Sequence, residues 1–232
     1  MQMPPTNSSD TTGREQMSLY YQDDHVTLYH GDALEIDAWL EADVLVTDPP
    51  YGYGHTSGRQ GAFQGEVIAN DHDLTARDSA LKVWGNKPAL VFGSWKKPRP
   101  EATHTLLIWD KGPASGMGDL RVPWKPNTEE IYVIGQGFQG KRTTSVLSGH
   151  TVVTWASNGR MHPNMKPTSL MEELINKCPP GVIADPFAGS GSTLVAARNL
   201  GRRAIGVELE EKYCEIIANR LSQGAFDFEA LA

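Results

Sequence analysis

Cysteines and long apolar runs are both scarce in this chain. Only two of its 232 residues are cysteines, Cys178 and Cys214, and they lack the C-x-x-C spacing of a zinc site or the pattern of a disulfide framework. No apolar run approaches the length of a membrane span, and the first residues lack the basic and then apolar pattern of a signal peptide. We therefore expect a cytoplasmic protein with no membrane partner and no metal.

Positive charge is also in short supply. The chain has 21 Lys and Arg against 28 Asp and Glu, a net charge of −7, which argues against a general nucleic-acid binder because phosphate contacts need clustered bases. The charge is uneven, however: from Lys96 to Arg142 eight bases stand against five acids. An acidic protein can still turn one basic face toward DNA, although a mixed solvated surface explains these residues equally well.

Apolar runs alternate with amphipathic segments, which predicts an α/β fold with a mostly parallel sheet. We expect a disordered lead-in over residues 1–16, a single domain over 17–222 and a tail over 223–232. The predicted strands cover residues 26–30, 42–46, 89–94, 105–111, 129–135, 151–155, 181–185 and 203–208. The predicted helices cover 33–41, 78–84, a segment from 168 or 169 with a Ser169–Glu172 capping box, 194–200 and 211–221. A long loop without a helix joins 105–111 to 129–135, so this pair is expected to be an antiparallel edge pair.

The stretch from Asp48 to Tyr51 follows a buried strand directly. Its two prolines stop the strand, so the acid and the aromatic ring are held at the carboxyl end, where open α/β sheets bind ligands. Asp48 and the Pro49 carbonyl are two acceptors that can converge on one amino group, and Tyr51 offers a flat face for a base such as adenine or cytosine. Taken alone, a proline-rich turn explains the same residues.

A second informative stretch runs from Gly181 to Thr193. It reads as a strand, a turn containing Gly189 and Gly191, and an Ala-rich helix, and the next strand ends in Glu208. A glycine turn lets the backbone approach a ligand, and a carboxylate at this distance takes ribose hydroxyls in nucleotide sites. No Lys follows the turn, so a phosphate-binding loop is not indicated.

Five ordered motifs together resemble the S-adenosylmethionine-dependent DNA amino-methyltransferases. They are Asp48-Pro49-Pro50-Tyr51, Leu107 to Lys111, Glu129 to Tyr132, His162 to Pro167 and Asp185 to Thr193. The order, with the catalytic motif before the cofactor motif, resembles the β group of that family. The resemblance implies a Rossmann-like, three-layer α/β/α methyltransferase fold with permuted motif order, in a bacterium or a phage-infected host cell.

The resemblance also implies roles for individual residues. Catalytic residues would be Asp48, Pro49, Pro50 and Tyr51, with Asp48 and the Pro49 carbonyl orienting the amino group of a base flipped out of double-stranded DNA. S-adenosylmethionine would be bound by Asp32, Lys166, Pro167, Asp185, Phe187, Gly189, Gly191, Ser192 and Glu208. DNA would be contacted by loops 52–75, 112–127 and 136–150, with Arg59, Arg121, Lys125, Lys141 and Arg142 as the bases.

The expected activity is methylation of adenine N6, because an Asp at the first motif position is more typical of adenine enzymes in this family. Methylation of cytosine N4 is the first alternative. A non-catalytic nucleic-acid-binding module of the same fold is the alternative from another class. The sequence leaves open the recognition site, a restriction partner, and the choice between monomer and homodimer.

Overall fold

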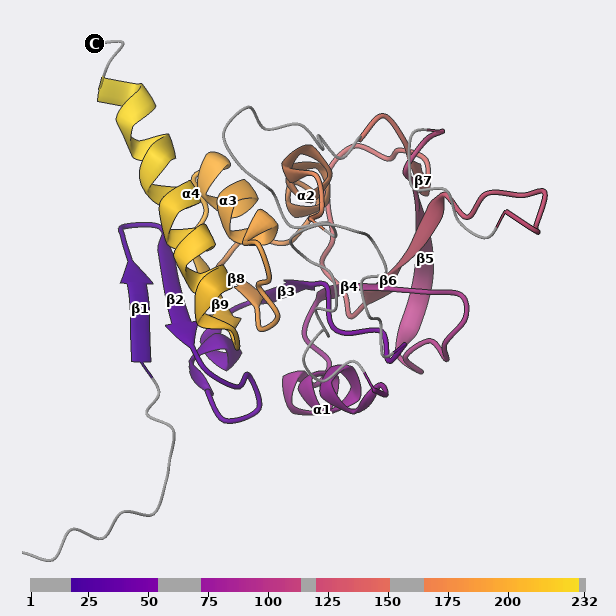
Figure 1. Ribbon diagram of the computed structural model, residues 1–232, viewed down its shortest axis with the longest axis horizontal. Helices are drawn as coiled ribbons and strands as arrows, with labels where there is room; N and C mark the ends of the chain where they lie inside the picture. The colour runs from indigo at the N-terminus through magenta and orange to yellow at the C-terminus, as the bar shows by residue number, and fades with distance from the viewer. Residues whose placement is uncertain (1–17, 54–71, 114–119, 151–164, 230–232) are drawn as a thin grey trace, which may run out of the picture.

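The computed structural model describes residues 18–53, 72–113, 120–150 and 165–229, with side chains as far as 223. These residues form one mixed sheet with helices on both faces (Figure 1). Its strands are β1 (Ser18–Gln22), β2 (Val26–His30), β3 (Val44–Thr47), β4 (Ala89–Gly93), β5 (Thr103–Asp110), β6 (Thr128–Ile134), β7 (Val146–Leu147), β8 (Ile183–Asp185) and β9 (Ala204–Glu208). The order across the sheet is β1-β2-β9-β8-β3-β4-β6-β5-β7.

The centre of the sheet is parallel, and each side of it contains antiparallel pairs. Strands β2, β9, β8, β3 and β4 run parallel to one another, while β6 runs antiparallel to both β4 and β5, and β1 antiparallel to β2. The predicted antiparallel pairing of 105–111 with 129–135 is therefore confirmed, but the pair does not form the edge of the sheet, because β7 lies beyond β5. The mostly parallel α/β prediction is confirmed with it.

Two apolar cores cover the two faces of the sheet. The helices α2 (Thr168–Ile175), α3 (Ser192–Asn199) and α4 (Glu211–Glu229) lie on one face, and the short 3-10 helix η1 (Ala38–Glu41) and α1 (Thr75–Trp84) lie on the other (Figure 1). Side chains of β3 alternate between the cores, because Val44 and Val46 join the first and Leu45 the second. The fold therefore has the three predicted layers.

Several element boundaries differ from the sequence prediction. Only Ala38–Glu41 of the expected helix over 33–41 is helical, and the Asp32 carbonyl before it accepts hydrogen bonds from Glu35 and Ile36 in a separate turn. The helix α4 continues through most of the expected tail. Strands β1 and β7 were not predicted. The expected lead-in over 1–16 and the expected strand over 151–155 lie outside the described residues.

The predicted capping box at the start of α2 is wrong. The helix begins after Pro167, with no side-chain cap at its first turn. The Ser169 hydroxyl instead hydrogen-bonds the His150 ring at 3.0 Å, and Glu172 accepts from Asn199 at 2.7 Å. Both side chains therefore tie α2 to its neighbours.

Candidate active site

Three acidic residues lie at the carboxyl ends of neighbouring parallel strands. Asp48 follows β3, Asp185 ends β8 and Glu208 ends β9, and these strands are adjacent in the sheet. The Thr47 hydroxyl donates to Asp185 Oδ1 at 2.7 Å and so joins the ends of β3 and β8. The two stretches singled out in the sequence thus meet at one edge of the sheet.

Tyr51 lies against Asp48 within the proline turn. Its hydroxyl donates to Asp48 Oδ1 at 2.7 Å, and the ring meets Tyr53 edge-on with the centroids 6.2 Å apart. Burial raises the pKa of Tyr51 well above its ordinary value, and the nearby Asp48 and Glu129 charges raise it further. The hydroxyl therefore stays protonated and acts here as a hydrogen-bond donor.

Lys166 reaches the same carboxylate from the segment before α2. Its ammonium lies 2.5 Å from Asp48 Oδ2 and 3.2 Å from Glu129 Oε2, while its carbonyl accepts from the Ser192 hydroxyl at 2.8 Å. Burial alone would lower the pKa of Lys166, but the charges of Asp48 and Glu129 outweigh it and raise the pKa. Lys166 is therefore a fixed cation that joins the proline turn to the first residue of α3.

Glu129 and Lys111 complete this buried charge network, although neither was named as a site residue from sequence. The Lys111 ammonium pairs with Glu129 Oε1, and the Glu129 side chain is 16% exposed. Burial raises the pKa of Glu129, but Lys166 and Lys111 more than offset it and hold the pKa below the usual range. The sequence signal was the antiparallel pair β5–β6, which places residues 111 and 129 diagonally on one face.

The glycine turn after β8 holds Glu208 through its backbone. The Gly189 N–H donates to Glu208 Oε2 at 2.7 Å, and the Glu210 N–H donates to Oε1 at 2.8 Å. Burial raises the pKa of Glu208 to about 7 despite these bonds. A donor arriving at this carboxylate, such as a ribose hydroxyl, would share it with the turn.

The two glycines of the turn have different roles. A side chain on Gly189 would meet only the Phe187 carbonyl oxygen at 4.0 Å, so this glycine borders open space. Gly191 has φ +79°, and a Cβ there would lie 2.8 Å from Ile217 of α4. Gly191 therefore also has a packing role against α4, and a place for both glycines beside the ligand stays a prediction.

The other predicted cofactor residues surround the same strand ends. Asp185 is buried, its pKa is raised to about 6 mainly by burial, and it accepts from the Phe187 N–H at 3.2 Å. Asp32 follows β2, whose register pairs His30 with Glu208 of β9, and its Oδ1 accepts from the Leu34 N–H at 2.8 Å. Pro167 precedes α2 directly.

These residues suit a nucleoside that carries a positive charge. The carboxylates of Asp32 and Glu208 lie at adjacent strand ends and can accept from the amino and hydroxyl donors of a nucleoside. The turn at Gly189 is open on one side, as a close backbone approach to a ligand requires. Acidic groups also favour a cationic ligand over a phosphate.

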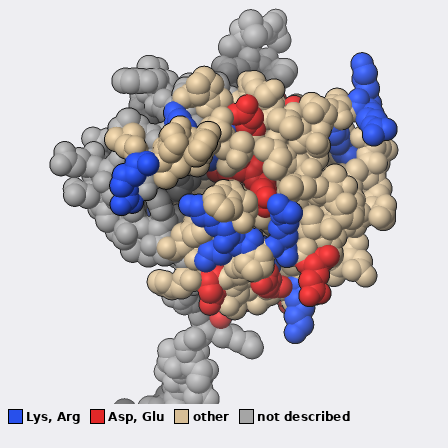
Figure 2. Space-filling view, turned by 90° about the vertical axis from the view of Figure 1, so that its right-hand side faces the viewer, with Lys and Arg blue, Asp and Glu red and all other residues tan. Residues whose placement is uncertain are grey.

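The predicted DNA-contacting bases are spread over surface loops. Arg59 lies outside the described residues. Arg121, Lys141 and Arg142 are exposed, and so is Lys125, whose ammonium donates to the Pro113 carbonyl at 2.6 Å. Lys and Arg side chains gather in the middle of the face that carries β5 and β7, with acidic side chains among them (Figure 2).

Within the described ranges, no group of three or more His, Cys, Asp or Glu side chains comes together as a metal site would require. Asp73 accepts a hydrogen bond from the Thr75 N–H at 2.8 Å. Among the helices described, none has the length and apolar character that crossing a membrane requires.

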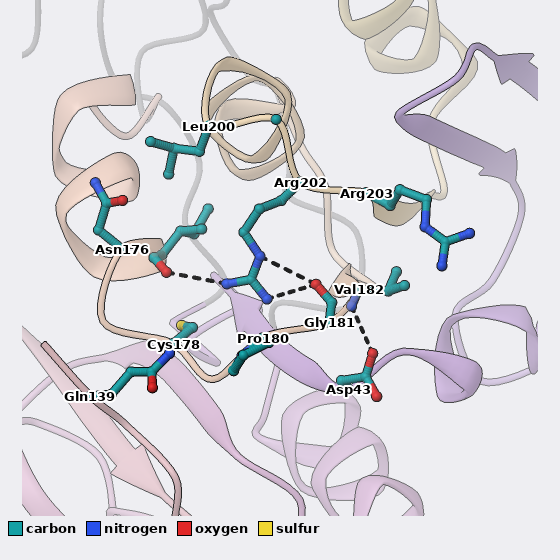
Figure 3. Close-up of a pocket in the computed structure, with 12 residues that line it drawn as sticks. Asp43, Gln139, Asn176, Cys178, Pro180, Gly181, Val182, Leu200, Arg202 and Arg203 are labelled. Atoms are coloured by element: carbon teal, nitrogen blue, oxygen red, sulfur yellow. Dashed lines mark hydrogen bonds between the residues drawn. The ribbon is translucent and has the colours of Figure 1, made fainter.

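A hollow of about 520 Å³ lies at the opposite, amino edge of the sheet (Figure 3). Asp43, Val182 and Arg203, which precede β3, β8 and β9, line it. The Arg202 guanidinium donates to the carbonyls of Ile175, Pro179 and Gly181 at 2.6–3.3 Å. These bonds cap the end of α2, so Arg202 has a structural role there, and the hollow is remote from Asp48.

Comparison with known proteins identifies a family, a relative and solved structures that resemble this chain. Residues 81–219 match the model of the N6/N4 DNA methylase family. The chain is 36% identical to the type II methyltransferase M2.LlaDCHI of Lactococcus lactis subsp. cremoris, over 89% of this chain and 93% of that protein. The fold is shared with M1.HpyAVI, solved as a SAM complex, at 22% identity and TM-score 0.63, over 84% of this chain and 98% of that one. It is also shared with the cytosine-N4-specific PvuII DNA methyltransferase, at 17% identity and TM-score 0.63, over 88% and 89%.

Proposed function

Because this chain belongs to the N6/N4 DNA methylase family, we propose that it transfers a methyl group from S-adenosylmethionine to the N6 of an adenine flipped out of double-stranded DNA. The observation that carries the proposal is the meeting of Asp48 and Tyr51 with the glycine turn and Glu208 at one sheet edge. The relative M2.LlaDCHI is a type II methyltransferase, which supports a role in restriction–modification.

The proline turn supplies the site for the target base. Asp48 and the Pro49 carbonyl accept the two amino protons, and the Tyr51 ring stacks on the base. These two hydrogen bonds would orient the amino group so that its nitrogen lone pair points toward the methyl group of the donor. The bound methyl donor would supply the methyl group for the new N–C bond, the electron pair of the methyl–sulfur bond would stay on sulfur, and one amino proton would pass to solvent.

The glycine turn and its neighbours supply the site for the methyl donor. When bound, S-adenosylmethionine provides an electrophilic methyl group on a positively charged sulfur. Phe187 and Gly189 lie at the turn where the methionine end would bind, Glu208 would accept from the ribose hydroxyls, and Asp32 from the adenine amino group. The M1.HpyAVI–SAM complex, which has the same fold, supports this choice of donor.

Surface loops that carry exposed basic residues would bind the DNA. Arg121, Lys125, Lys141 and Arg142 are exposed and suited to phosphate contacts, which position a duplex without reading its sequence. We retain residues 17–222 as a single methyltransferase domain that provides both the target and donor sites.

Cytosine N4 is the second candidate, because cytosine presents a similar amino group and the PvuII enzyme has the same fold. Asp48 at the first motif position favours adenine. Mass spectrometry of nucleosides from DNA methylated by the pure protein separates N6-methyladenine from N4-methylcytosine, and the second product would refute the adenine assignment.

Transfer of a labelled methyl group to unmethylated DNA tests the function itself. We expect the wild type to label DNA, and Asp48→Ala to lower kcat by at least ~100-fold, because the amino group loses its charged acceptor. Equal labelling by both proteins would remove Asp48 from the mechanism. A wild type that binds DNA without labelling it would favour the non-catalytic binding module.

A further inference from the structure

Both carboxylate oxygens of Asp48 already hold a donor. Oδ1 accepts from the Tyr51 hydroxyl at 2.7 Å and Oδ2 from the Lys166 ammonium at 2.5 Å. A target amino group must share this carboxylate with two donors, one of them charged. A carboxylate has further lone pairs, but each donor already bound to it neutralises part of the negative charge that the amino group meets, so the site works better if both donors have another acceptor within reach.

Glu129 lies where such an acceptor is needed. Its Oε2 is 3.2 Å from the Lys166 ammonium and 3.5 Å from the Tyr51 hydroxyl oxygen, so both donors on Asp48 also face Glu129. Its Oε1 is held by the Lys111 ammonium. Glu129 therefore has one oxygen fixed by its own cation and the other turned toward the donors.

We propose that Glu129 is the alternative acceptor that takes the Tyr51 hydroxyl and the Lys166 ammonium from Asp48 when the target amino group arrives. The exchange changes hydrogen bonds only, and both protons stay on Tyr51 and Lys166. Asp48 is then left with lone pairs for the amino group. Glu129 is thus a positioning residue, and this role rests on the proposed methyl transfer.

Lys111 fixes the geometry of the exchange. It follows β5, Glu129 lies on β6, and the two antiparallel strands hold the pair on one face of the sheet. Without the Lys111 ammonium, Oε1 would lose its charged partner and the carboxylate could rotate away from Tyr51 and Lys166. Lys111 should therefore act on the reaction only through Glu129.

The next residue along β6 is a matched control. Glu130 is buried and also paired, with Arg99 at 2.6 Å and the Tyr132 hydroxyl at 3.0 Å. Its side chain points to the opposite face of the sheet because successive residues of a strand alternate. Glu129→Gln and Glu130→Gln thus remove the same charge from neighbouring positions, the first partly buried and the second buried, and only the first faces Asp48.

Steady-state methyl transfer by the wild type, Glu129→Gln, Glu130→Gln, Lys111→Gln and the Lys111→Gln/Glu129→Gln double variant tests the proposal. We expect Glu129→Gln to lower kcat by about 10- to 100-fold and to leave the KM for S-adenosylmethionine within ~2-fold. Glu130→Gln should keep kcat within ~3-fold even if it melts at a lower temperature. The double variant should be no slower than Glu129→Gln.

The outcomes distinguish failure of the role of Glu129 from failure of the proposed function. If the wild type methylates DNA and the kcat of Glu129→Gln falls no further than that of Glu130→Gln, the role of Glu129 is refuted and the proposed function stands. If Glu129→Gln does not fold, Lys111→Gln decides, and an unchanged kcat overturns the proposal. A wild type that transfers no methyl group refutes the proposed function, and the role of Glu129 with it.

Discussion

Asp48 is the point at which the parts of the candidate site converge. Tyr51 reaches it from its own turn, Lys166 from the segment before α2, and Glu129 of β6 through both of these side chains. The two anions and the two cations of the network offset one another. The charges can therefore be buried together, because each carboxylate has a partner.

Glu208 gives a prediction about pH at the scale of one residue. Its folded pKa of about 7 is raised above the ordinary value of 4.5, so the folded state holds its proton more tightly than the unfolded chain. This stabilisation is complete below about pH 4.5 and is lost as the pH rises through 7. The Glu208→Gln side chain cannot lose a proton. The free energy of unfolding of this variant, relative to that of the wild type, should therefore rise between pH 5 and pH 8 by up to about 3 kcal/mol.

Urea melts of both proteins at several pH values measure this difference. The difference between variant and wild type isolates Glu208, because the other titrating groups contribute to both. A difference that stays constant from pH 5 to pH 8 would show that Glu208 does not have the raised pKa.

At the scale of elements, α3 is held between β9 and α4 by close contacts. A side chain on Gly206 of β9 would lie 2.6 Å from Leu194 of α3, and one on Gly191 would lie 2.8 Å from Ile217 of α4. Ile217 is fully buried and branched at Cβ, so it has little freedom to move aside. Packing therefore fixes the start of α3 and, with it, the glycine turn after β8.

Gly191→Ala should be more destabilising than an ordinary substitution at a left-handed glycine. It adds a clash with Ile217 to the strain of φ +79°, and we expect a loss of about 2–4 kcal/mol in the free energy of unfolding. Gly201→Ala is the control, since Gly201 has φ +66° but nothing within 4 Å, and it should lose only about 1–2 kcal/mol. Equal losses in urea melts would rule out the packing role of Gly191.

The elements that could be predicted from sequence are those whose side chains carry the signal locally. The apolar run of β2 matches its prediction residue for residue, and β4 matches to within one residue. The expected helix before β3 shrank to η1, because the Trp39 indole donates to the Ala33 carbonyl and the Asp32 carbonyl closes a turn. Those bonds are tertiary or depend on turn geometry, and helical periodicity does not reveal them.

Some residues of the candidate site could likewise be predicted from sequence, and others could not. Asp48, Tyr51 and Glu208 each follow a strand that composition predicts, so their meeting at one sheet edge could be predicted. Glu129 depends on the register between β5 and β6, in which Trp109 faces Glu129, and no single stretch of sequence contains that register. The contact of Lys166 with Asp48 spans 118 residues and needs the folded chain.

At the scale of the whole molecule, the proposed function requires a protein of net charge −7 to bind a polyanion. The basic side chains on the face in Figure 2 would overcome that charge locally. Binding should therefore weaken steeply as salt rises, because phosphate contacts release counterions. The affinity for a duplex should fall linearly on a plot of log affinity against log salt concentration.

Replacing Lys141 and Arg142 with Gln together tests whether these two exposed bases contact DNA. If both contact phosphates, the slope should become shallower by about 2, whatever the DNA sequence. Fluorescence anisotropy at several salt concentrations measures the slope, and Lys82→Gln on α1, which lies on the other side of the sheet, is the control. A slope that changes equally in both variants would place the DNA elsewhere.

The hollow in Figure 3 has a practical consequence for inhibitor discovery. A fragment search that started from this hollow of about 520 Å³ would miss the reaction centre, because five residues of extended chain, roughly 16 Å, separate Asp43 at its rim from Asp48. A fragment bound there would not compete with the methyl donor. Hits from such a screen should therefore be ranked by displacement of the methyl donor rather than by occupancy.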